Sequence, residues 1–73
     1  MASAQTFSLD GQEFILLQSL LQVVGLCDSG GEAKTLVVDG KVTVDGEVET
    51  RRGKKIRAGQ SVTCRGASIQ VLE

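Results

Sequence analysis

The dipeptide Asp45-Gly46 is the feature of this sequence that most restricts the fold. It separates Lys41–Val44 from Glu47–Thr50, two stretches in which apolar and polar residues alternate. An Asp-Gly pair in this position favours a two-residue type I′ turn, because both positions of that turn need a positive φ. We therefore expect a β-hairpin with one face in the core. The core-facing residues are expected to be Val42, Val44 and Val48, and the solvent-facing residues Thr43, Glu47 and Glu49, or those of a closely related register.

A first helix is predicted before this hairpin, over about Gln12–Val24. Asp10 and Glu13 have the spacing of a capping box at its start, and Gly25 can end it in a left-handed conformation. Its apolar residues recur at spacings of three and four, which predicts one buried stripe. The stripe consists of Phe14, Leu17, Leu20, Leu21 and Val24.

A second helix is predicted over Gly30–Asp39. Ser29 and Glu32 repeat the capping-box spacing, and Gly40 supplies the stop. Two glycines in the first turn, at positions 30 and 31, each weaken the helix by about 1 kcal/mol relative to Ala. Either this turn packs closely on the first helix, or a phosphate approaches its bare N–H groups.

The rest of the chain completes an α+β domain. A short strand is predicted at Thr6–Leu9 after a flexible leader over residues 1–5, and a second hairpin joins Gln60–Cys64 to Ser68–Leu72 around Arg65-Gly66-Ala67. The expected fold has two N-terminal helices packed on a small, mainly antiparallel sheet of roughly four to five short strands. A chain of 73 residues has room for one core, so residues 1–73 should form a single domain.

The residue inventory argues against most enzyme classes. The sequence has no His, and its two cysteines, Cys27 and Cys64, are too few for a four-ligand zinc site. Ser-His-Asp and Cys-His catalysis are excluded for the same reason. The cysteines fit free, reduced thiols better than a disulfide. We expect a protein that is not an enzyme and has no metal, cofactor or small-molecule substrate.

The apolar stretches are too short for a membrane protein. The longest begins at Phe14, and polar residues interrupt it well before the roughly 20 apolar residues that a membrane span needs. We expect no membrane span and no secretory signal, and therefore a cytoplasmic location.

The charges are unevenly distributed along the chain. Residues 1–49 carry eight acids and two bases, whereas residues 50–73 carry six bases and one acid. Five bases lie in the stretch 51–57, which we call the basic segment: Arg51, Arg52, Lys54, Lys55 and Arg57. Such a cluster attracts polyanions, although it can also be a solvated loop or an edge strand protected by its charge. The two further bases, Lys34 and Lys41, are expected near one face of the second helix.

The helix and hairpin motifs together resemble the S4-like RNA-binding domain, or αL motif. The matching residues are Leu17-x-x-Leu-Leu-x-x-x-Gly25-x-x-x-Ser29-x-x-x-Ala33-Lys34, then Gly40-x-Val42-x-Val44-Asp45-Gly46, and finally Ile56-x-Ala-Gly59-Gln60-x-Val62. The resemblance covers about Phe14–Thr63. It is strongest to the short, stand-alone bacterial YbcJ-like type, in which Val-Asp-Gly-x-Val-Glu-Thr-Arg recurs, here as Val44–Arg51.

This resemblance implies a small RNA-binding protein, with RNA lying along the second helix and the adjacent hairpin. By position, Ser29 starts the helix, Lys34 faces the RNA backbone, and Lys41 with the basic segment supplies the remaining charge. Many family members have Arg directly after the serine, where this chain has Gly30. RNA binding here should therefore depend less on the start of the second helix and more on the basic segment.

The expected partner is structured RNA, ribosomal or transfer, in association with the ribosome, and the protein is expected to be a monomer. Aromatic residues are scarce, so no stacking platform for splayed bases is expected. Recognition should therefore depend mainly on backbone and shape. The alternative is a protein-interaction module that docks on a ribosomal protein or an RNA-modifying enzyme, through an edge strand or through exposed Ile15 and Leu16.

Overall fold

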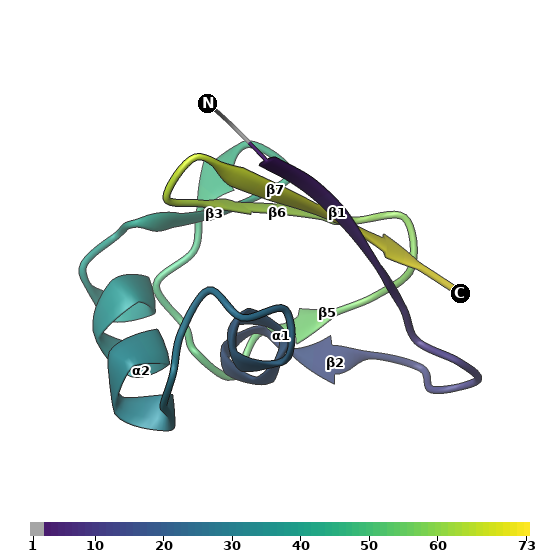
Figure 1. Cartoon of the computed structure of the whole chain (residues 1–73), viewed down its shortest axis with the longest axis horizontal. Helices are drawn as coiled ribbons and strands as arrows, with labels where there is room; N and C mark the ends of the chain where they lie inside the picture. The colour runs from purple at the N-terminus through teal and green to yellow at the C-terminus, as the bar shows by residue number, and fades with distance from the viewer. Residues whose placement is uncertain (1–2) are drawn as a thin grey trace.

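Two layers make up the fold, which we describe from a computed structural model that covers residues 3–73. One layer is a five-stranded sheet, and the other contains both helices and a two-stranded sheet (Figure 1). In chain order the elements are β1 (Ser3–Ser8), β2 (Ile15–Leu16), α1 (Leu17–Val23), α2 (Gly30–Val38), β3 (Val42–Val44), β4 (Glu47–Val48), β5 (Lys55–Ile56), β6 (Ser61–Cys64) and β7 (Ala67–Leu72).

The larger sheet has the strand order β1-β7-β6-β3-β4. Its pairs β7–β6, β6–β3 and β3–β4 are antiparallel, and β1 pairs with β7 in parallel. This agrees with the expected α+β class and the mainly antiparallel sheet. The helices are not the first elements, however, because β1 and β2 precede them. The separate sheet of β2 and β5 was not anticipated.

Both predicted hairpins are confirmed. Asp45 and Gly46 have φ values of 52° and 85°, as a type I′ turn requires. Arg65 and Gly66 make the second turn, with φ values of 52° and 76°. This turn has two residues, because Ala67 already pairs with Cys64 in the strands.

The expected register of the first hairpin is wrong at Val48. Val42 and Val44 are buried, but Val48 is 60% exposed. It pairs directly with Thr43. Directly paired residues of antiparallel strands point to the same face, and Thr43 faces away from the core because its neighbours in β3 face inward.

Helix α1 starts five residues later than expected, at Leu17. Asp10 lies in a turn with a φ of 53° instead of capping the helix. Ile15 and Leu16 are extended and pair with β5, a distant partner that a local capping pattern does not reveal. The predicted end is confirmed. The amides of Gly25 and Leu26 donate to carbonyls of the last helical turn, and Gly25 has a φ of 84°.

Helix α2 matches its prediction closely. The Ser29 side chain accepts a hydrogen bond of 3.2 Å from the amide of Glu32, while the Glu32 carboxylate accepts one of 2.9 Å from the amide of Asp28. Gly40 ends the helix with a φ of 76°. A Cβ at Gly30 would lie 3.4 Å from the end of the Gln22 side chain on α1, which is an ordinary van der Waals contact.

The first strand is longer than the predicted Thr6–Leu9. Strand β1 begins at Ser3 and pairs with β7 along its whole length. Residues 3–5 of the expected flexible leader therefore belong to the sheet, and Met1 and Ala2 lie outside the described residues.

The hydrophobic core lies between the two layers. Its largest fully buried side chains are Leu17, Leu20, Leu21, Ile56, Ile69, Val37, Val42, Val62, Val71 and Cys64. Cys27 and Cys64 are buried free thiols, and burial raises the pKa of both. Within residues 3–73, no helix is long and apolar enough to cross a membrane.

Candidate nucleic-acid interface

The backbone of the basic segment is fixed to α1 and β2. Strand β5 pairs with β2, and Ile56 is fully buried. The amide of Leu17 donates to the carbonyl of Lys54 at 2.9 Å, and that of Gln18 to the carbonyl of Arg52 at 3.1 Å. The segment is therefore not simply a solvated loop, because the buried Ile56 anchors it in the core.

These contacts also complete the start of α1. Leu16 is the N-cap residue, and its side chain makes no capping hydrogen bond. The first amides of a helix have no partner within the helix. Carbonyls of the basic segment supply two of those partners, so the segment and the helix stabilise each other.

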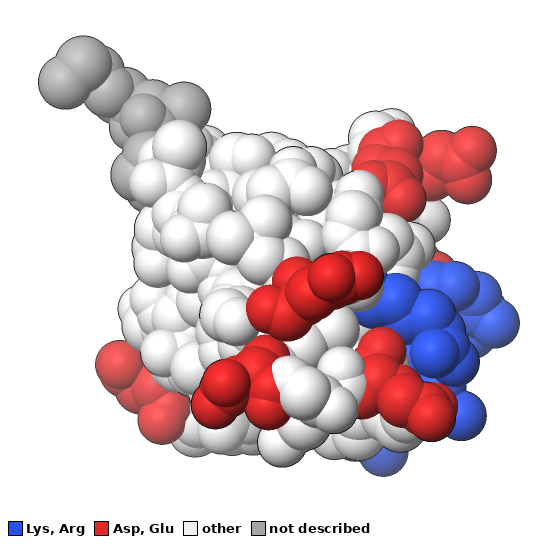
Figure 2. Space-filling model, turned by 90° about the vertical axis from the view of Figure 1, so that its right-hand side faces the viewer, with Lys and Arg blue, Asp and Glu red and all other residues white. Residues whose placement is uncertain are grey.

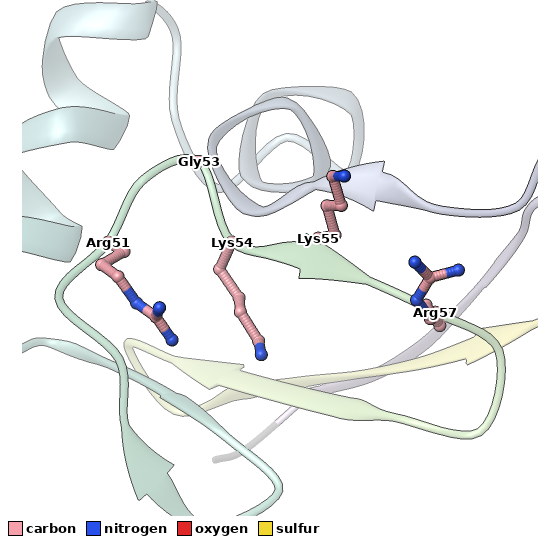
Figure 3. A pocket seen from close by; sticks show the side chains of 5 residues that line it. All are labelled: Arg51, Gly53, Lys54, Lys55 and Arg57. Atoms are coloured by element: carbon pink, nitrogen blue, oxygen red, sulfur yellow. The ribbon is translucent and has the colours of Figure 1, made fainter.

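The side chains of the segment surround a shallow depression of about 550 Å³. It is lined by Arg51, Gly53, Lys54, Lys55 and Arg57. Figure 3 shows that Arg51 and Lys54 point to one side of the backbone, and Lys55 and Arg57 to the other. In Figure 2 the Lys and Arg side chains in view gather at one edge, whereas the acidic side chains are spread across the face.

Arg51 is paired with a carboxylate that the sequence analysis did not connect to it. Its Nε lies 3.0 Å from Glu49 Oε2, and a second side-chain bond of 3.3 Å joins Nη2 to Oε1. These bonds, together with one from the Arg51 amide, lower the pKa of the Glu49 carboxyl. Residues two apart on an extended chain share a face, and that spacing could have revealed the pair. Glu49 thus compensates one of the five charges of the segment.

Phe14 is a further residue that the sequence analysis misjudged. It was predicted in the buried stripe of the first helix, but it precedes β2 and is half-buried. Lys55 Nζ lies 4.9 Å and Arg57 Cζ 5.7 Å from the centroid of its ring. Both are cation–π distances. An aromatic ring therefore accompanies the basic segment.

The remaining predicted residues lie around the segment and helix α2. Four predicted residues line the depression: Arg51, Lys54, Lys55 and Arg57. Arg52 is exposed in the same segment, Lys34 is exposed on α2, and Lys41 is exposed just beyond its end. Ser29 caps α2. Contact of these residues with RNA stays a prediction.

One base outside the predicted set has a structural contact. Arg65 Nη1 donates to the carbonyl of Leu26 at 3.3 Å, and Arg65 Nη2 lies 3.9 Å from a carboxylate oxygen of Glu32. Arg65 thus joins the β6–β7 turn to the connection between the helices.

The helices, the β3–β4 hairpin and the mixed sheet form an αL motif. The family model of the S4 domain matches residues 7–72, so the chain belongs to the S4 domain family. This confirms the resemblance inferred from the sequence motifs.

Relatives of similar length support the same assignment. YbcJ of Escherichia coli (strain K12), a candidate RNA-binding protein, is 46% identical over 67 residues, which cover 92% of this chain and 96% of YbcJ. RlbA of Bacillus subtilis (strain 168), a candidate ribosome maturation protein, is 36% identical over 70 residues, with coverage of 94% and 97%. The solution structure of E. coli YbcJ superimposes with a TM-score of 0.73, covering 93% of this chain and 86% of that one, and is described as revealing an αL motif involved in RNA binding.

Proposed function

We propose that this protein binds structured RNA, ribosomal or transfer, through the basic segment, and reads mainly backbone and shape. Lys34, Lys41 and Ser29 extend this surface along α2. The protein acts as a monomeric, cytoplasmic binding protein and not as an enzyme, and its RNA partner is associated with the ribosome.

The observation that carries the proposal is a fixed backbone that presents exposed cationic side chains. Hydrogen bonds to α1 and pairing with β2 hold the segment in place, while Arg52, Lys55 and Arg57 remain exposed. A phosphate-binding surface of this kind loses little backbone entropy on binding. The description of YbcJ supports RNA as the polyanion, and that of RlbA supports a ribosomal context.

The experiment is a salt titration of binding to a structured RNA hairpin. Four cations of the segment other than Arg51 are available: Arg52, Lys54, Lys55 and Arg57. Four phosphate contacts give a slope of log K against log salt of roughly −3 to −3.6. Replacing both Lys54 and Lys55 by Ala should reduce that slope by about half and leave the melting temperature nearly unchanged.

Two results would contradict the proposal. One is a slope near zero, and the other is equal competition by duplex DNA, since shape recognition should favour A-form RNA. Either result would favour the protein-interaction module instead. Ile15 packs against the core, so that module would use an edge strand of the sheet or the half-buried Leu16.

A further inference from the structure

The sheet of β2 and β5 has an inner and an outer face. Ile15 pairs with Ile56, and both side chains pack into the core. Neighbouring residues of a strand point to opposite faces, so Lys55 and Arg57, on either side of Ile56, point outward. Continuing the register by one residue places Phe14 opposite Arg57, on the same outer face.

The ring of Phe14 does not serve the core. Among the residues that the structure describes, the half-buried apolar side chains packed on the core are Phe7, Ile15, Val24, Leu26 and Ala58, and Phe14 is not one of them. The cations of Lys55 and Arg57 lie within cation–π distance of the ring. A half-buried aromatic side chain thus lies beside the depression that these two cations help to line.

We propose that Phe14, flanked by Lys55 and Arg57, is a binding subsite for an unpaired RNA base. The inference rests on the proposed function and extends it from backbone contacts to a base contact. Aromatic side chains stack on unpaired bases irrespective of their identity, and cations beside them bind the adjoining phosphates. The preferred RNA is then a helix with a neighbouring loop or bulge.

An unpaired base reaches the Phe14 ring by taking the place of a cation that lies over it. The Arg57 guanidinium lies 5.7 Å from the ring centroid, close to the limit of about 6 Å for a cation–π contact. A base can therefore displace it at little cost. The displaced guanidinium then stacks on the base or pairs with its phosphate, both of which are common arginine contacts to RNA.

The test compares Phe14→Leu, which keeps an apolar side chain, with Phe14→Tyr, which keeps the ring. Each variant is titrated with an RNA hairpin and with a fully paired RNA duplex of equal length. Phe14→Leu should lower the affinity for the hairpin about tenfold and that for the duplex less than about twofold, because only the hairpin offers an unpaired base. Phe14→Tyr should bind both RNAs like the wild type.

A second measurement uses the wild-type protein alone. A fluorescent adenine analogue in the hairpin loop should be quenched on binding, because stacking quenches its emission. If Phe14→Leu lowered the affinity for the hairpin and for the duplex equally, the ring would only orient Lys55 and Arg57. That result would overturn the proposed base-binding subsite. Absent quenching in the wild type would also overturn it. Failure of both RNAs to bind with a salt-dependent affinity would instead overturn the proposed function.

Discussion

Glu49 is the residue that limits the positive charge of the basic segment. Its side chain is only 14% exposed and makes two bonds to the Arg51 guanidinium, which is itself 74% exposed. A phosphate that approaches Arg51 must compete with this carboxylate. We therefore expect the pair to weaken RNA binding while it holds Arg51 in one position.

Replacing Glu49 by Gln should strengthen RNA binding. The change frees Arg51 and removes a negative charge beside the depression, so the affinity should rise about threefold at moderate salt. The salt slope should also steepen by roughly one contact. Binding titrations at several salt concentrations measure both effects.

The matched control for this variant is Glu47→Gln, which changes an exposed carboxylate of the same hairpin. Glu47→Gln should raise the RNA affinity less than Glu49→Gln does, and it should leave the salt slope unchanged. Equal gains from the two variants would mean that general repulsion, and not the pair with Arg51, limits binding.

The same ion pair should make stability depend on pH in one direction. The pKa of the Glu49 carboxyl is lowered in the folded protein by the Arg51 hydrogen bonds. The folded state therefore gains stability above the ordinary carboxyl pKa, and loses it as pH falls through the lowered value. Exposure of Arg51 keeps the effect small.

Thermal unfolding of the wild type and of Glu49→Gln over a pH series measures this effect. The difference in melting temperature should be largest near neutral pH and should disappear in acid. A difference that grew towards acid pH would contradict the assignment.

At the scale of elements, α1 depends on partners outside itself. Its seven residues, Leu17–Val23, have no side-chain cap, and its first amides use carbonyls of the basic segment. Its end depends on Gly25, whose φ of 84° is unfavourable for residues with a Cβ. Such a short helix would not be stable alone in water.

Gly25→Ala should therefore lower the free energy of unfolding by roughly 1–2 kcal/mol. Nothing lies within 4 Å of a Cβ at this position, so the cost is conformational and not steric. Gly53→Ala is the control, because a Cβ there also meets nothing within 4 Å and no positive φ is involved. Gly53→Ala should change stability by less than about 0.5 kcal/mol, as denaturant titrations can measure. Similar effects at both glycines would refute the argument.

Local patterns in the sequence predicted the elements that local chemistry determines. The turn at Asp45-Gly46 and the helix from Ser29 to Gly40 were both predicted correctly, because their turn and cap residues are adjacent in sequence. The start of α1 was not predicted correctly, because Ile15 pairs with Ile56, a partner far along the chain. The cationic residues of the candidate site were visible as a cluster, whereas the role of Phe14 depends on the same distant pairing.

At the scale of the whole molecule, one small core supports both the fold and the basic segment. Leu21 of α1 is fully buried in that core. Leu21→Ala should cost roughly 2–5 kcal/mol, a large share of the stability of a domain of this size. RNA binding should be lost along with folding, because α1 holds the segment through its first amides.

Val23→Ala tests whether this effect depends on the core. Val23 belongs to the same helix but is 63% exposed, so its loss should change stability by less than about 0.5 kcal/mol. Denaturant unfolding and RNA titration of both variants check the prediction. A Leu21→Ala protein as stable as the wild type would place the core on another face of α1.

The pairing of β1 with β7 has a consequence for how the chain folds. Ser8 Oγ donates to the backbone carbonyl of Glu73, 65 residues further along, so the two ends of the chain meet in one sheet. Closing a loop of this length costs more entropy than closing either hairpin, and contacts of high sequence separation slow folding. A chain emerging from the ribosome cannot form this pair until β7 has been synthesised. We therefore expect β1 to join the sheet after the two hairpins have formed.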